Sequence, residues 1–267
     1  MPARRNTTAR RLTARSVVAS TLLGVHPPRL PIRALVGSAA LFGIADGTVR
    51  VAVSRMVQAG ELEPDGDGYR LSGALLARQA RQDRSRAGQT RRWRGTWRTA
   101  VVVADARSSS QRADLRAAMA SLRLAELREG VWLRPDNIPT DAADPAQDVV
   151  DQQCRWLTSR VDDPVSLAAD LWDLDSWSRR ATSLCTALDE LLPRLEAGDT
   201  AVLADGFVLA ADVLRHFQSD PLLPDDLLPS PWPGGELRRR YDRYAAAFTT
   251  TIRRWNQSQG QDVTRAV

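Results

Sequence analysis

The chain has 267 residues, of which 43% are hydrophobic and 26% are charged, and its formal net charge is +5 at neutral pH. This composition is that of a globular protein with room for more than one domain, and no apolar run approaches the roughly 18 residues that span a bilayer. The basic start has no clear signal-peptide cleavage site, and the two cysteines form no metal-like spacing. We therefore expect a cytoplasmic protein that does not associate with a membrane.

Positive charge is concentrated in the first third of the chain. Residues 1–100 hold 18 arginines and six acidic residues, a net charge of +12, whereas the rest holds 19 arginines and 26 acidic residues, a net charge of −7. A basic segment on an acidic body predicts a polyanion partner for that segment alone. A solvated surface rich in arginine through genome composition would explain the absence of lysine, but it would not explain the separation by sign.

Three helices and a β-hairpin are predicted for this basic third. Residues 14–25 are typical of a first helix, and a second is expected to start near Pro31 and to end at Gly43. A short link leads to a third helix at residues 46–58, as in a helix-turn-helix. Two strands joined by Asp-Gly turn signals follow within residues 61–72. This order of elements is that of a winged helix-turn-helix.

The third helix is amphipathic. Val49, Val53 and Met56 belong to an apolar stripe with helical spacing, and Asp46 is expected to cap the helix. We expect the opposite face to enter the major groove of double-stranded DNA, where arginine can address guanine or phosphate. The predicted DNA-binding residues, one of which lies on the return strand of the hairpin, are Gly47, Thr48, Arg50, Val51, Ser54, Arg55, Gln58 and Arg70. A small helical domain whose arginines are merely solvated is the alternative.

The tip of the hairpin, "DGDG" at residues 65–68, is acidic. Phosphate should repel such a tip. Either the wing stands away from the DNA backbone, or only Arg70 on its return strand makes contact.

The domain plan follows from the same pattern, and the expected fold class is α+β. Residues 1–77 form the winged helix-turn-helix domain, and residues 78–92 form a basic linker that is either a charged helix or a flexible connector. Residues 93–174 begin with a β-α-β order and continue with two looser segments, which suits a ferredoxin-like central domain. Residues 175–267 have helical patterns around a proline-rich loop and predict a C-terminal helical domain.

Five segments occur in this order along the chain: "VRVAVSRMVQAGEL", "WRGTWRTAVVV", "LRAAMASLRLAELREGVWLRP", "LWDLDSW" and "DPLLPDDLLPSPWPG". In these segments the sequence resembles the PaaX family of bacterial transcriptional repressors, which control phenylacetate catabolism and related aromatic pathways. The resemblance implies a homodimer on an inverted-repeat operator, and release from DNA by phenylacetyl-coenzyme A or another aryl-coenzyme A effector. The acidic wing tip departs from the family, whose wing is usually basic or neutral.

An effector site is expected between the central and C-terminal domains. Aromatic side chains there could stack on an aryl group. The candidate effector-binding residues are Trp172, Trp177, His216 and Trp232. Core packing is the alternative for each tryptophan, and a structural or interface role is the alternative for the histidine.

Catalysis is not expected. The sequence has no Ser-His-Asp spacing, phosphate-binding loop or dinucleotide fingerprint, and we expect no cofactor and no metal. The resemblance implies a central domain similar to small CRISPR-associated adaptation nucleases, which use an aspartate at the end of the first strand, and Asp105 lies near that place. One carboxylate supplies at most a fragment of a metal site. A metal-dependent nuclease and a scaffold without specific DNA binding are the alternatives to a transcriptional regulator.

Overall fold

The computed structural model describes residues 12–104, 107–139 and 144–265. The chain divides into two compact units. Unit 1 comprises Met1–Asp83, Thr186–Val213 and Arg239–Val267, and unit 2 comprises Arg84–Cys185 and Leu214–Arg238. The described residues form helices and two small antiparallel sheets, so the predicted α+β class is confirmed.

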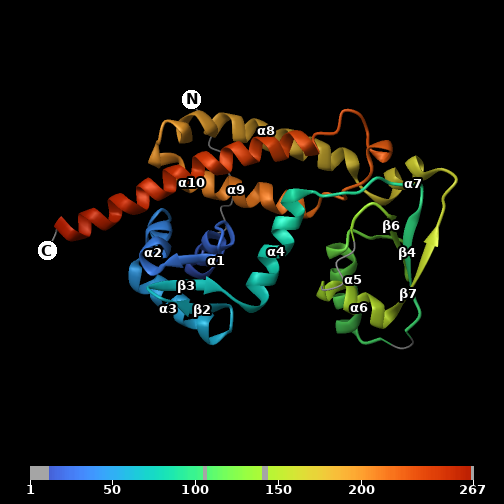
Figure 1. The fold of residues 1–267 in the computed structure, drawn as a ribbon, viewed down its shortest axis with the longest axis horizontal. Helices are drawn as coiled ribbons and strands as arrows, with labels where there is room; N and C mark the ends of the chain where they lie inside the picture. The colour runs from blue at the N-terminus through green and yellow to red at the C-terminus, as the bar shows by residue number, and fades with distance from the viewer. Residues whose placement is uncertain (1–11, 105–106, 140–143, 266–267) are drawn as a thin grey trace, which may run out of the picture. The chain divides into compact units, whose positions relative to one another are not determined.

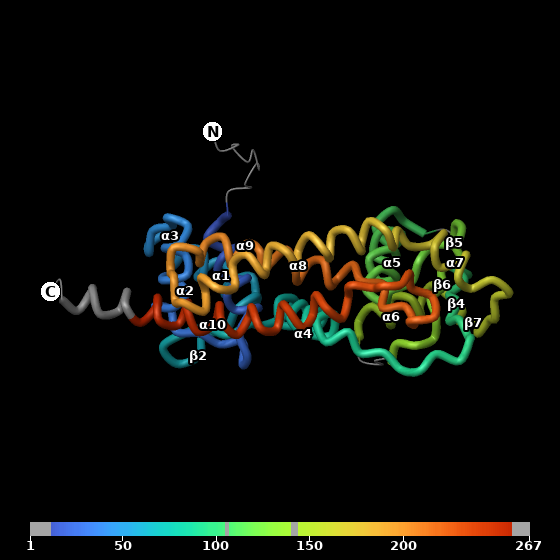
Figure 2. The backbone as a smooth tube through the Cα atoms, turned by 90° about the horizontal axis from the view of Figure 1, so that it is seen from above, coloured from blue at the N-terminus to red at the C-terminus, as the bar shows by residue number. Residues whose placement is uncertain are grey.

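Unit 1 begins with three helices and a hairpin, as the sequence predicts. The elements are α1 (Ala14–Leu23), α2 (Ile32–Ala40), α3 (Asp46–Gln58), β2 (Leu62–Asp65) and β3 (Gly68–Leu71), and Figures 1 and 2 show the three helices grouped together. A short strand, β1 (Arg29–Pro31), was not expected. It pairs antiparallel with β3 and completes a sheet of order β1-β3-β2.

The start of α3 differs from the expectation. Ala45 holds the extended backbone of the N-cap position, with φ −67° and ψ 148°, and its side chain makes no capping hydrogen bond. Asp46 is already in the first helical turn, so the expectation that it caps α3 was wrong. Its carboxylate instead forms an ion pair with Arg50, one turn further along the helix.

The core of unit 1 fixes the orientation of α3. Val49, Val53 and Met56 are at most 1% exposed and pack with side chains of α1 and α2. Each such buried side chain contributes roughly 1.5–3 kcal/mol relative to an exposed one. Phe207 of α9 (Leu203–Gln218) belongs to the same core, and the indole N–H of Trp255 in α10 (Gly234–Arg265) donates to the carbonyl of Gly37 at 3.1 Å. Segments from the end of the chain thus help to hold the helices of its beginning.

Unit 2 contains a four-stranded antiparallel sheet of order β5-β6-β4-β7. Its elements follow the order β-α-β-β-α-β along the chain: β4 (Trp97–Val102), α5 (Ser109–Ser121), β5 (Ala125–Arg128), β6 (Val131–Pro135), α6 (Pro145–Gln153) and β7 (Cys154–Ser159). Helix α6 was not anticipated. It begins where the Asp144 side chain accepts a hydrogen bond from the backbone N–H of Ala146 at 3.0 Å.

The two faces of this sheet are covered differently. On one face, Ala100 and Trp132 pack with Leu115 of α5 and Val150 of α6. On the other face, Trp97 and Leu133 pack with apolar residues of α7 (Pro164–Leu171), the start of α8 (Leu174–Glu196) and the proline-rich loop. Side chains alternate between the faces of a strand, so the positions two residues from Ala100 and Trp132 also lie on the face under α5 and α6.

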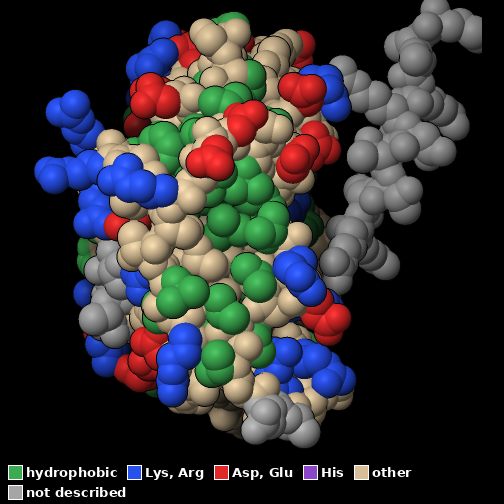
Figure 3. Space-filling view, turned by 90° about the vertical axis from the view of Figure 1, so that its right-hand side faces the viewer, with side chains coloured by type: hydrophobic (Ala, Val, Ile, Leu, Met, Phe, Trp, Pro, Cys, Tyr) green, Lys and Arg blue, Asp and Glu red, His purple; other side chains and the backbone are tan. Residues whose placement is uncertain are grey.

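Residues 78–92, for which a charged helix and a flexible connector were both expected possibilities, are helical as far as Ala87, the last residue of α4 (Gly73–Ala87). Among the described helices, none combines the length and the apolar character needed to cross a membrane. On the face drawn in Figure 3, arginine and acidic side chains lie next to one another around a central area of hydrophobic side chains.

Candidate nucleic-acid interface

The outer face of α3 is exposed along its whole length. All seven α3 residues predicted to contact DNA are exposed, from Gly47 to Gln58, whereas Val49, Val53 and Met56 on the opposite side are buried. Val51 is 52% exposed, so its side chain is available to a partner. Apolar contact with a thymine methyl group is one use of such a residue in the major groove.

The two arginines of α3 have different surroundings. The Arg50 Nε atom lies 2.7 Å from Oδ1 of Asp46, and both side chains are more than half exposed. An exposed ion pair of this kind contributes little free energy, so Arg50 can exchange the carboxylate for another anion at small cost. For Arg55 the described residues provide no ion pair, and its side chain is exposed.

Arg70, the predicted contact on the hairpin, is engaged within the hairpin. Its Nη2 atom lies 2.5 Å from Oε2 of Glu63 on the paired strand β2. The Ser72 hydroxyl donates to Oε1 of Glu63 at 2.6 Å. This hydrogen bond, together with the charge of Arg70, lowers the pKa of Glu63, so the carboxylate is ionised at neutral pH.

The acidic wing tip is partly neutralised by Arg29, a residue that was not predicted from the sequence. Arg29 lies on β1, directly opposite Arg70 in the ladder, and its Nε atom is 3.1 Å from Oδ2 of Asp65. Asp67 is exposed and keeps the tip acidic. A three-residue strand is too short to show a two-residue period, so only pairing in three dimensions brings Arg29 to the wing.

Three of the four predicted effector residues lie together in unit 2. The Trp177 ring stacks on the His216 ring, with centroids 4.3 Å apart and an interplanar angle of 21°, and on the Trp232 ring at 4.6 Å and 14°. Trp172 is not part of this stack. It stacks instead on Trp97 of the sheet, with centroids 6.4 Å apart.

The aromatic stack contains two polar atoms without partners among the described residues. Trp177 is 7% exposed, and both its indole nitrogen and Nε2 of His216 are buried and form no hydrogen bond there. Burial also lowers the pKa of His216, because the charged imidazolium loses its hydration. Unpaired buried polar atoms are uncommon in folded proteins, so these two are places where a ligand's polar group would gain hydrogen bonds.

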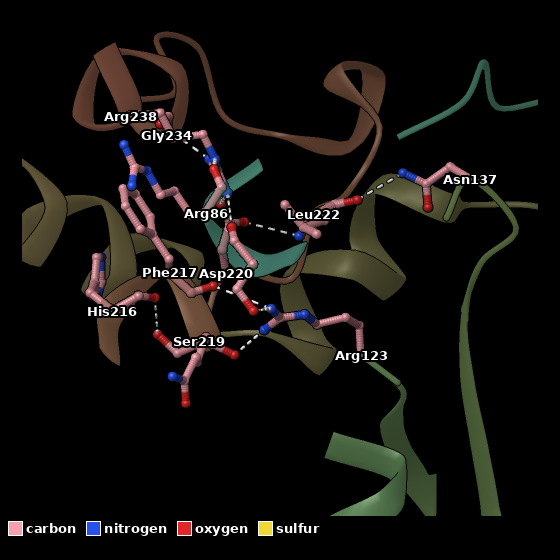
Figure 4. A network of polar contacts seen from close by, with 12 residues as sticks. Arg86, Arg123, Asn137, His216, Phe217, Ser219, Asp220, Leu222, Gly234 and Arg238 are labelled. Carbon is pink, nitrogen blue, oxygen red and sulfur yellow. Dashed lines mark hydrogen bonds and ion pairs between the residues drawn. The ribbon is translucent and has the colours of Figure 1, made fainter. Parts of the chain in front are cut away.

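A polar network lies beside the stack in unit 2 (Figure 4). Asp220 accepts from Arg238 at 2.9 Å, and Arg238 also donates to the carbonyls of Ser85 and Arg86 in the last turn of α4. Arg123 donates to the Ser85 hydroxyl at 2.8 Å and to carbonyls at the end of α9. Two arginines thus satisfy the carbonyls that helices α4 and α9 leave unpaired at their ends.

Within the part of the chain that the structure describes, no group of three or more histidine, cysteine, aspartate or glutamate side chains is placed to hold a metal ion. Asp105, on which the nuclease alternative depends, lies outside the described residues.

Three family models match successive parts of the chain. The model for a PaaX-like protein matches residues 13–75, the model for the PaaX protein central Cas2-like domain matches residues 90–166, and the model for the PaaX-like protein C-terminal domain matches residues 172–258. The chain belongs to the family of PaaX-like proteins. Membership confirms the resemblance found in the sequence and indicates a transcriptional regulator.

A solved structure is similar to nearly the whole chain. The "Uncharacterized protein Rv0674 from Mycobacterium tuberculosis" is 41% identical, and the match covers 91% of this chain and 98% of that chain with a TM-score of 0.70. No curated protein matches the chain.

Proposed function

We propose that this PaaX-like protein is an effector-responsive repressor that binds double-stranded DNA through α3. The observation that carries the proposal is the fully exposed outer face of α3, held in place by a buried inner face, in a chain of a regulator family. We infer that α1 to α3 and the sheet β1-β3-β2 act as a winged helix-turn-helix. We infer equally that the β-α-β-β-α-β order of unit 2 is a ferredoxin-like domain.

The residues of α3 would divide the work of recognition. Arg50 and Arg55 would donate to guanine or phosphate, Thr48 and Ser54 would donate to or accept from neighbouring groups, and Val51 would contact a thymine methyl group. Phosphate contacts position the protein and base contacts specify the sequence, so both kinds are needed for an operator.

We propose further that the protein works as a homodimer on an inverted-repeat operator. A twofold symmetric dimer presents two identical recognition helices, and these require two half-sites related by the same symmetry. Family membership supports this proposal, and a half-site spacing of about 10 base pairs or a multiple is the expected consequence.

The effector is proposed to be an aryl-coenzyme A compound bound at the stack of Trp177, His216 and Trp232. Support comes from the two unpaired polar atoms of the stack and from the network beside it, which holds the last turn of α4. Helix α4 starts two residues after the wing strand β3. The ligand must bind the DNA-incompetent state more tightly, since a ligand with equal affinity for both states shifts nothing.

DNA binding is tested by fluorescence anisotropy on labelled duplex from the region upstream of the gene, with scrambled duplex as reference, at two salt concentrations. Arg50→Ala and Arg55→Ala are expected to weaken binding to the upstream duplex by about 1–3 kcal/mol each if the arginine contacts a base. Arg128→Ala, an exposed strand arginine of unit 2, removes the same charge and should bind like the wild type. If both α3 variants also bind like the wild type, α3 is not the recognition helix.

Release is tested on the same complex with phenylacetyl-coenzyme A, using free coenzyme A as the control. The aryl compound is expected to weaken operator binding by about 5- to 150-fold, the usual range of coupling between two sites. Trp232→Ala should abolish this response and leave operator affinity without ligand unchanged. A full response in Trp232→Ala would move the effector site away from the stack, and no response in the wild type would exclude this effector.

A further inference from the structure

Unit 2 contains a buried arginine with no carboxylate partner among the described residues. Arg134 on β6 is 5% exposed. Its Nη1 donates to the carbonyl of Pro135 at 3.0 Å and its Nη2 donates weakly to that of Ile138 at 3.5 Å, while its Nε is buried and makes no hydrogen bond to a described residue. A buried charge is costly unless it is paired with an opposite charge, so this guanidinium lacks the partner that such a site normally has.

A second arginine lies directly opposite. Arg98 on β4 pairs in register with Arg134 on β6 and, on its other side, with Thr158 on β7. The three side chains therefore form one row across the sheet, and like charges opposite each other in a ladder are unfavourable. The guanidinium of Arg98 lies 4.0 Å from the ring centroid of Trp156. Burial lowers the pKa of Arg98, and burial together with the charge of Arg98 lowers the pKa of Arg134 to about 10, so both stay cationic at neutral pH.

The two nearby carboxylates also accept hydrogen bonds from other groups. Asp136 accepts from Arg91 at 2.6 Å. Asp151 accepts from Gln147 and from the indole N–H of Trp156, both at 2.6 Å. The guanidinium groups of Arg91, Arg98 and Arg134 thus interact electrostatically with the carboxylates of Asp136 and Asp151. Three positive charges face two negative ones, so this part of the folded unit carries excess positive charge.

We propose that Arg98 and Arg134 form a binding site for a phosphate-class anion at this end of the sheet. The row runs from buried Arg134 through partly exposed Arg98 to exposed Thr158, so an anion can approach over Thr158 and Arg98. Arginine binds phosphate through parallel N–H donors, and a bound anion would supply the negative charge that Arg134 lacks. The phosphate is either part of a small molecule or part of a nucleic-acid backbone. The site does not rest on the function proposed for α3.

The first experiment measures thermal unfolding of the full chain in inorganic phosphate or pyrophosphate, with chloride at equal ionic strength as the reference. Phosphate at about ten times Kd should raise Tm by roughly 2–5 °C. The rise should persist in Arg128→Met, which removes an exposed strand arginine, and should be lost in Arg98→Met and Arg134→Met. Arg98→Met keeps the test valid if Arg134→Met does not fold, because Arg98 is only partly buried.

The second experiment identifies the source of the phosphate. Binding to scrambled duplex is measured against salt concentration, where each phosphate contact contributes about 0.9 to the logarithmic slope. A smaller slope in Arg98→Met and Arg134→Met assigns the site to DNA backbone, and an unchanged slope with a lost rise in Tm assigns it to a small molecule. An equal rise in Tm in every variant overturns the proposal, as does no rise together with an unchanged slope.

Discussion

Arginine has two distinct structural roles in the two units. On α3 the side chains of Arg50 and Arg55 are exposed, and the ion pair of Arg50 is a weak pair within the helix. In unit 2, Arg134 and Arg238 are largely buried and donate to backbone carbonyls. A polyanion can bind the first group at small cost, whereas the second group holds helices and strands in place or provides a site for an anion inside the fold.

This contrast shows what net charge does and does not reveal. The basic first third of the sequence points to a surface for DNA, and the exposed face of α3 agrees with it. The acidic rest of the chain nevertheless contains the most deeply buried guanidinium groups among the described residues. A segment's net charge therefore describes its solvent-facing side chains, and it does not describe which charged groups the fold encloses.

The contrast is tested most strongly by removing the acidic partner of a buried arginine. Asp220 is 2% exposed in its side chain and Arg238 is 17% exposed. Asp220→Ala leaves the guanidinium buried without its counter-ion, and it is expected to lower the free energy of unfolding by about 3–5 kcal/mol. Urea unfolding followed by circular dichroism measures this loss.

Asp189→Ala is the matched control for that measurement. Asp189 also pairs with an arginine, Arg240, but both side chains are more than one-third exposed. An exposed pair contributes about 0–1 kcal/mol, so this variant should unfold nearly like the wild type. Equal losses in the two variants would contradict the distinction between buried and exposed arginines.

Protonation of the buried His216 offers a second test of how unit 2 treats an enclosed charge. Burial lowers the pKa of His216 from its ordinary value of 6.5; a hydrogen bond with the backbone of Trp177 and the charge of Asp220 oppose this shift, and Arg180 adds to it. As the pH falls below 6.5, the unfolded chain takes up the proton first, so the free energy of unfolding should fall until the folded state is protonated as well. The slope is at most about 1.4 kcal/mol per pH unit for one proton.

The control for this slope is His216→Phe, which keeps an aromatic ring in the stack and removes the titrating group. This variant should lose the slope below pH 6.5 in urea unfolding measured across pH. His26→Gln retains His216 and should keep the slope. A slope that survives in His216→Phe would assign the pH dependence to other groups.

Local patterns predicted much of the fold. The stripe of Val49, Val53 and Met56 predicted both the existence of α3 and its buried side, because helical spacing alone places these residues together. Asp-Gly signals likewise placed the hairpin of β2 and β3. Helix α6 was missed although Asp144 and Pro145 are a typical helix start, so a signal for it was present in the sequence.

Other features depend on contacts that no local pattern contains. β1 has three residues, and only its pairing with β3 makes it a strand. The sequence "VWLRP" places Arg134 on a strand, but which face α5 and α6 cover is decided by the packing of distant segments. For the same reason the sequence grouped Trp172 with Trp177, whereas the fold places Trp172 against Trp97.

The smallest expected effect concerns an exposed charge, at the acidic wing tip. Asp67 is exposed, and the nearby Asp65 is already paired with Arg29. If the wing lies near the DNA backbone, Asp67→Asn removes a repulsion with phosphate and should strengthen operator binding by less than about 1 kcal/mol.

Asp162→Asn makes the same change of charge at an exposed position of unit 2. Because salt screens exposed charges, the difference between these two variants should shrink as salt rises. Equal affinities at low salt would show that the wing stands away from the DNA, and recognition would then rest on α3 alone.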